Sequence, residues 1–163
     1  MLMKAMTGTS LTSMKPFNSI IGEKYRWPTT IPYYLEDSLE LNAKGVILKT
    51  FDQYRLKTCI DFTPWTGEKN YISVYKGSGC SSSVGNRQVG KQKLSIGKNC
   101  DRLGTVEHEF MHALGFWHEQ SRADRDDYVK IIWDHIKPGN ISTLTFLSSV
   151  SCVICGLLPC AAD

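Results

Sequence analysis

The stretch His108-Glu-Phe-Met-His112-Ala-Leu-Gly115-Phe-Trp-His118 is the part of the sequence that most strongly determines the expected fold. Histidines four residues apart lie one turn above each other on the same face of a helix, so His108 and His112 can bind one ion. Glycine adopts a left-handed conformation at low cost, so Gly115 can end the helix and turn the chain back. His118 can then supply a third nitrogen. The spacing therefore predicts a three-histidine metal site at the end of a helix.

The chemistry of this site is expected to be hydrolytic. Structural zinc sites are closed by four protein ligands, whereas catalytic zinc sites have three and keep one position open for water. Zinc lowers the pKa of such a water to about 7, which makes it a usable nucleophile. Glu109 is displaced around the helix from the histidine pair, where its carboxylate can act as general base without binding the metal. We therefore expect one Zn²⁺ per chain and hydrolysis of peptide bonds by a zinc-activated water.

The motif is more specific than its first five residues. An HExxH match alone arises by chance on many helices, but a glycine and a third histidine at fixed offsets make the assignment specific. The extended motif resembles that of the metzincins, and the run His118-Glu-Gln-Ser-Arg122 resembles the astacin family within them. The resemblance covers about residues 20–138, including the segments 22–28, 55–62 and 124–129. It implies a zinc metalloendopeptidase acting on peptides and proteins, outside the cell or at its surface, and able to form homo-oligomers.

The resemblance also assigns roles outside the helix. Glu119 matches an acid that contacts the amino terminus created by propeptide removal, which would lie here near Asn18 or Ser19. Cys80 and Cys100 match a pair that the family joins as a disulfide, which favours an oxidising compartment. Cys59 matches a cysteine whose family partner is absent, so it is either free or paired with a tail cysteine. The tail cysteines are Cys152, Cys155 and Cys160.

The sequence divides into three parts. Residues 1–17 are unlike the family, residues 18–139 form an incomplete astacin-like peptidase domain, and residues 140–163 are a divergent tail. Metzincins have a methionine turn beneath the metal, and astacins place a zinc-associated tyrosine just after it. The tail contains neither Met nor Tyr. We therefore expect the lower subdomain to be largely missing, and the alternative function is a catalytically impaired zinc-binding fragment or a partner-binding isoform.

Composition and charge exclude several other classes of function. The formal net charge of +3 is modest, so nothing indicates a nucleic-acid partner. Residues 1–17 have no apolar run long enough for a secretory signal, and no signal peptide is evident. Residues 141–162 carry no charge, which leaves membrane contact open, although several Ser and Thr residues and Pro159 disfavour it. Residues 85–91 resemble a phosphate-binding loop, but Gln92 replaces the hydroxyl residue that would bind magnesium, so a nucleotide site is not expected.

The expected fold is α/β (α+β), with the mixed twisted sheet and active-site helix of a metzincin upper subdomain. Apolar residues at steps of four or three predict a helix with Ala43, Ile47, Phe51 and Tyr54 on its core face. Residues 77–85, rich in glycine and serine, predict a loop. An edge strand of the sheet could hold an extended peptide. The predicted strands are 31–35, 59–62, 71–75 and 93–96.

Overall fold

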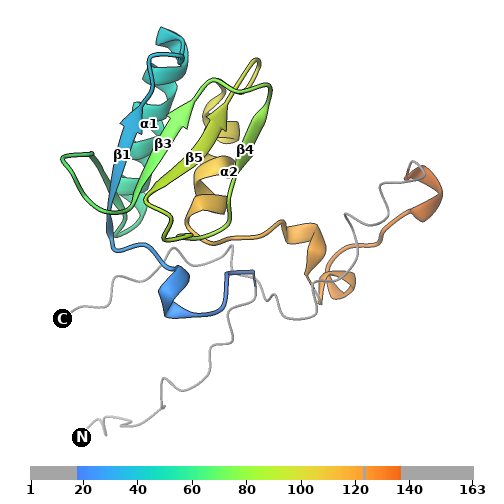
Figure 1. Cartoon of the computed structure of the whole chain (residues 1–163). Coiled ribbons are helices and arrows are strands. Elements are labelled where there is room, and N and C mark those ends of the chain that lie inside the picture. Colours follow the sequence, from blue (N-terminus) through green and yellow to red (C-terminus); the bar gives the residue numbers. More distant parts are fainter. Residues whose placement is uncertain (1–17, 123, 137–163) are drawn as a thin grey trace, which may run out of the picture.

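The computed structural model describes residues 18–122 and 124–136, and within them five strands form one mixed sheet (Figure 1). The strand order is β2-β1-β3-β5-β4, in which β4 pairs antiparallel with β5 and all other neighbours are parallel. The strands are β1 Thr30–Leu35, β2 Asp61–Pro64, β3 Tyr71–Tyr75, β4 Cys80–Ser82 and β5 Lys91–Ile96. The fold is α+β, as the sequence predicts.

Two α-helices, α1 Leu41–Lys57 and α2 Leu103–Ala113, cover the same face of the sheet (Figure 1). Four short 3-10 helices complete the described elements. They are η1 Glu23–Tyr25, η2 Glu119–Ser121, η3 Arg125–Asp127 and η4 Trp133–His135. None of the described helices is long and apolar enough to span a membrane.

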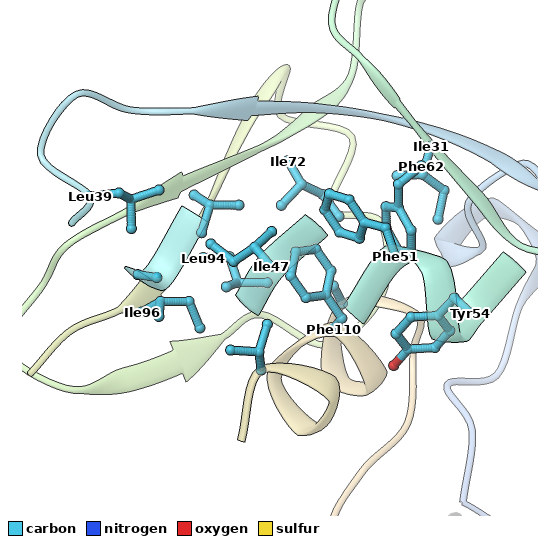
Figure 2. Packing of buried hydrophobic residues seen from close by; sticks show 14 of the residues in the cluster. Ile31, Leu39, Ile47, Phe51, Tyr54, Phe62, Ile72, Leu94, Ile96 and Phe110 are labelled. Carbon is cyan, nitrogen blue, oxygen red and sulfur yellow. The ribbon is translucent and has the colours of Figure 1, made fainter. Parts of the chain in front are cut away.

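An aromatic cluster joins both helices to the sheet (Figure 2). Phe51 of α1 stacks on Phe62 of β2 with ring centroids 4.4 Å apart. Phe110 of α2 meets these rings edge-on at 5.0 and 5.1 Å. Edge-to-face and offset pairs at such distances are the favoured arrangements of aromatic rings. The cluster therefore ties α2, the helix of the histidine motif, to the rest of the core.

The helical stripe predicted from sequence is confirmed. Ala43, Ile47, Phe51 and Tyr54 are all buried on α1. The strand predicted at residues 71–75 has those same bounds, and the one predicted at 31–35 begins one residue earlier. The local pattern was sufficient for these elements. Helix α1 buries one regular face, whereas β1 and β3 are short runs in which consecutive residues are buried.

Three predictions need correction. The strand expected at residues 59–62 is β2, Asp61–Pro64, because Thr58 Oγ1 accepts a hydrogen bond from the Ile60 amide and the chain is still turning away from α1 there. The strand expected at 93–96 begins at Lys91. The loop expected at 77–85 contains β4, whose three residues pair with β5. Predictions about residues 1–17 and the tail fall outside the described residues.

Candidate metal centre

Helix α2 presents two faces of opposite character. Val106, Phe110 and Ala113 recur at steps of four and three and are buried against the core. Successive residues of a helix are rotated by about 100°, so His108 and His112 lie on the side away from this apolar face. The packing of α2 therefore orients both histidines away from the core.

The end of α2 turns the chain back toward these histidines. Gly115 has a φ of +106°, in the region that favours glycine. Its amide donates to the His112 carbonyl at 2.8 Å, and the Phe116 amide donates to the Met111 carbonyl at 3.0 Å. These two bonds make a Schellman motif, which commonly ends helices at glycine. The prediction that Gly115 ends the helix is confirmed.

The turn brings the Nε2 atoms of all three histidines together. His108 and His112 are 3.0 Å apart at Nε2, His112 and His118 are 2.9 Å apart, and His108 and His118 are 3.3 Å apart. A neutral imidazole nitrogen either donates or accepts, so three such nitrogens cannot satisfy all three contacts by hydrogen bonds. Tetrahedral zinc with nitrogens at 2.0–2.1 Å requires them to be about 3.3 Å apart. The triangle fits one zinc ion.

The surroundings favour the metal-binding form of these rings. His112 Nδ1 donates to the Phe116 carbonyl oxygen at 2.7 Å, which leaves the lone pair on Nε2. Burial lowers the pKa of His108 and of His118, and neighbouring histidines lower both further, so the rings favour their neutral form. Among the described residues, no other His, Cys, Asp or Glu belongs to this group.

Glu109 lies on α2 between the histidine side and the apolar side. The residue is only 6% exposed, and this burial raises the pKa of its carboxyl, with a smaller opposing effect from His112. The side chain is therefore a shielded carboxyl one residue after the first histidine, and its role as general base stays a prediction.

Residues 18–20 pair with the segment that carries His118. Ser19 and Phe116 form an antiparallel bridge, and the Trp117 amide donates to the Asn18 carbonyl at 2.9 Å. The Asn18 side chain is 1% exposed, and its Nδ2 donates to Glu119 Oε2 at 2.8 Å. The family resemblance predicted that Glu119 contacts an amino terminus near Asn18 or Ser19, and that contact stays a prediction. In the structure, Glu119 accepts from the side-chain amide of Asn18.

The predicted disulfide is present, since Cys80 and Cys100 are bonded and join β4 to the segment before α2. Cys59 lies half-buried after α1. The tail cysteines considered as its partners lie outside the described residues.

The sequence did not reveal two polar groups that bond segments around the site. One is the Phe116 carbonyl, which a Schellman motif predicted at Gly115 would have suggested. The other is Gln92, a polar residue at an inward position between outward-facing Lys91 and Lys93. That break in the alternation was a signal that could have been found.

Comparison with known proteins identifies the family. Residues 19–155 match the family model described as Astacin, a family of peptidases. The chain belongs to the astacin family. The astacin resemblance predicted from the motif is thereby confirmed.

Individual astacin-type relatives agree with this assignment. The chain is 80% identical over 122 residues to meprin A subunit beta of Homo sapiens, and the match covers 75% of this chain and 17% of that protein. It is 43% identical over 135 residues to zinc metalloproteinase nas-6 of Caenorhabditis elegans, covering 82% of this chain and 39% of that one. The segments 22–28, 55–62 and 124–129 look particularly like the meprin beta subunit, and this match confirms that resemblance. This chain therefore spans a small part of the length of the meprin subunit that it matches.

A solved structure also resembles this fold. High choriolytic enzyme 1, a hatching enzyme zinc-protease from Oryzias latipes, superposes with a TM-score of 0.67 at 33% identity. The match covers 85% of this chain and 68% of that one. The chain thus has an astacin-type fold and corresponds to part of such a domain.

Proposed function

We propose that this chain is a zinc metalloendopeptidase of the astacin type, with His108, His112 and His118 as the metal ligands. The observation that carries the proposal is the convergence of three Nε2 atoms within 3.3 Å of one another. When bound there, Zn²⁺ would supply a Lewis acid that polarises the scissile carbonyl and makes water nucleophilic at neutral pH.

The protein's own groups have separate roles in this reaction. Glu109 takes the proton of the attacking water and later gives a proton to the leaving amine. The Phe116 carbonyl keeps His112 in one tautomer and one ring orientation, because it accepts the Nδ1 proton at 2.7 Å. Glu119 holds residue 18 against the segment that carries His118 through the Asn18 amide.

Strand β4 is suited to hold the substrate. Among the described residues it is the last strand of the sheet, pairs antiparallel with β5 only, and contacts α2. An extended peptide can add to such an edge through main-chain hydrogen bonds. Peptides and flexible segments of proteins are therefore the substrates that we propose.

The wider setting is proposed from the family and from the disulfide. A bond between Cys80 and Cys100 persists in oxidising compartments, which supports a location outside the cell or at its surface. Astacin resemblance also supports homo-oligomers. We place the incomplete peptidase domain in residues 18–139, after a non-family segment and before the divergent tail.

A second candidate is a zinc-binding domain with little or no catalysis. The observation that favours it is the composition of residues 140–163, which include no Met and no Tyr. Those residues therefore supply neither the methionine turn nor the zinc-associated tyrosine that the family resemblance leads one to expect.

Metal content and peptide cleavage, measured on the same sample, separate the two candidates. The full chain would be produced under oxidising conditions, analysed for zinc, and incubated with a quenched fluorescent peptide library, with Glu109→Gln as the matched variant. We expect one zinc per chain in both proteins and cleavage only in the unaltered one. Zinc without cleavage would establish the second candidate, and a chain that takes up no zinc would contradict both.

A further inference from the structure

Gln92 is a buried polar side chain whose amide nitrogen and oxygen both bond the same loop. It is 3% exposed on β5, inside the sheet. Its Nε2 donates to the Gly85 carbonyl at 2.9 Å, and its Oε1 accepts from the Arg87 amide at 2.9 Å. A buried amide that bonds two backbone groups of the same loop holds that loop in one conformation. If the loop moved and broke one of the two bonds, a buried polar group would be left without a partner, which costs free energy. The loop is residues 85–90, which lies within the stretch 85–91 that resembles a phosphate-binding loop.

The same loop touches the end of the histidine helix. The Gly85 amide donates to the His112 carbonyl at 2.9 Å, and the Gly115 amide donates to that carbonyl too. Gly85 therefore shares the His112 carbonyl with the turn that ends α2. The next amide, that of Asn86, donates to the Tyr25 carbonyl at 2.7 Å and connects the loop to the N-terminal segment.

The space around Gly85 leaves little freedom for movement. A Cβ on Gly85 would lie 2.8 Å from the Tyr25 carbonyl oxygen, and its φ is +73°. A Cβ on Gly115 would lie 2.8 Å from Ile20 Cγ2 and 3.9 Å from the Gly85 Cα. Ile20 thus lies against both glycines. A shift of Gly85 would therefore also displace Ile20 or Gly115, which is three residues before His118.

We propose that Gln92 is a positioning residue for the metal centre, acting through residues 85–87 on the His112 carbonyl and on the turn that carries His118. The inference rests on the proposed function. In this role Gln92 itself contacts neither metal nor substrate. Without the Gln92 amide, Gly85 loses the partner of its carbonyl and the loop no longer presents its amide to His112 in one position.

The test compares Gln92 with a buried polar residue on the same strand. Ser95 is also 3% exposed, and its Oγ donates to the Gly79 carbonyl at 2.6 Å. Gly79 lies in the loop that precedes β4, whereas residues 85–87 follow β4. Gln92→Met preserves the volume and removes both bonds, Gln92→Glu keeps the acceptor but replaces the donor by a second oxygen, and Ser95→Ala is the control. The full chain of each would be titrated with Co²⁺, whose visible spectrum reports ligand geometry.

We expect Gln92→Met to bind Co²⁺ about 10-fold more weakly with an altered spectrum, since groups that orient histidine ligands typically change metal affinity by about 10- to 100-fold. Gln92→Glu, which places a carboxylate oxygen opposite the Gly85 carbonyl, should also bind more weakly than the unaltered chain, and Ser95→Ala should match the unaltered chain. In metal-free protein, nitrogen NMR should show the His112 Nδ1 proton in the unaltered chain and in Ser95→Ala, and its loss or broadening in Gln92→Met.

Other outcomes would overturn the inference. Equal affinity, spectrum and His112 tautomer in all four proteins would show that Gln92 does not position the site. Failure of both Gln92 variants to fold, with Ser95→Ala folded, would assign Gln92 to general stability instead. If the unaltered chain bound no Co²⁺, the proposed function itself would fall, and this inference with it.

Discussion

Gly115 is the residue on which the third histidine depends. Its positive φ ends α2, and its amide and that of Phe116 bond back to the last turn of the helix. The Phe116 carbonyl then faces His112 Nδ1, so a single turn both brings His118 toward the site and orients His112. A side chain at this position would oppose both the backbone conformation and the packing of Ile20.

Gly115→Ala should therefore weaken both stability and metal binding. A non-glycine residue in this region costs about 1–3 kcal/mol, and the new Cβ would also lie 2.8 Å from Ile20 Cγ2. We expect unfolding in urea at a lower midpoint and weaker Co²⁺ binding than in the unaltered chain.

Gly104 on α2 provides the control for that change. A Cβ there would meet nothing within 4 Å, and alanine is favoured over glycine inside a helix by about 0.5–1 kcal/mol. Gly104→Ala should leave metal binding unchanged and keep or raise stability. Equal behaviour of the two variants would show that the conformation of Gly115 is not what the site requires.

At the scale of elements, α2 is held by the ring of Phe110. This ring contacts Phe51 from α1 and Phe62 from β2, so it connects three elements that are distant in sequence (Figure 2). The histidines lie on the opposite side of the same helix. Stability of the core and placement of the site are thus two consequences of one amphipathic helix.

Phe110→Ala should destabilise the fold strongly. Removing a buried phenylalanine leaves a cavity and costs about 3–5 kcal/mol. Leu56→Ala is the matched change on α1, where the side chain is 78% exposed and the expected effect is within about 0.5 kcal/mol. Urea unfolding followed by circular dichroism measures both. A loss of stability as small for Phe110 as for Leu56 would contradict the central place of the aromatic cluster.

The carboxyl of Glu36, just after β1, bonds side chains from two other strands of the sheet. The Lys91 ammonium and the Ser73 hydroxyl both bond Glu36 Oε1 at 2.8 Å, and Lys91 is the main reason why the pKa of this carboxyl is below its ordinary value. Glu36 follows β1, whereas Ser73 lies in β3 and Lys91 begins β5. The ionised carboxylate therefore stabilises the registry of neighbouring strands.

Stability should depend on pH through this group. Because the folded pKa is depressed, the contribution is complete above the unfolded pKa of about 4.3 and is lost as the pH falls from there through the folded pKa. Glu36→Gln should melt at a lower temperature than the unaltered chain at pH 7, and the gap should shrink below about pH 4. Asp37→Asn, which changes the exposed residue next to Glu36, serves as the control. A gap that stayed constant with pH would rule out the ion pair as its cause.

For the whole molecule, metal binding and folding should be linked. Residues 18–20, the end of α2 and His118 come together only in the folded chain, and a ligand that binds only the folded state raises stability. At a free concentration about 100 times its Kd, Zn²⁺ should add about 2.7 kcal/mol and raise the melting temperature. Differential scanning calorimetry with and without Zn²⁺ measures this shift.

Two comparisons keep that measurement specific. Mg²⁺ prefers oxygen ligands and should leave the melting temperature unchanged. His118→Ala removes one of the three nitrogens and should abolish most of the effect of Zn²⁺. An equal rise in that variant would mean that the ion binds elsewhere on the protein.

The sequence by itself determined the parts of this protein that depend on near neighbours. The stripe of α1, the strand at residues 71–75, the histidine pair and the turn at Gly115 each follow from spacings of a few residues, because helices and strands repeat over that distance. The family followed from a local motif with a specific spacing, and the disulfide was implied by the family resemblance that this motif carries.

Only the tertiary structure decided which distant segments meet. Residues 18–20 pair with residues 115–117, Gln92 bonds a loop that reaches His112, and β4 forms on the edge of β5 inside a stretch that is locally a loop. No local periodicity encodes such contacts. They form because the packed core brings unpaired backbone groups within reach, and a buried amide or carbonyl must find a partner among whatever segments the fold places beside it.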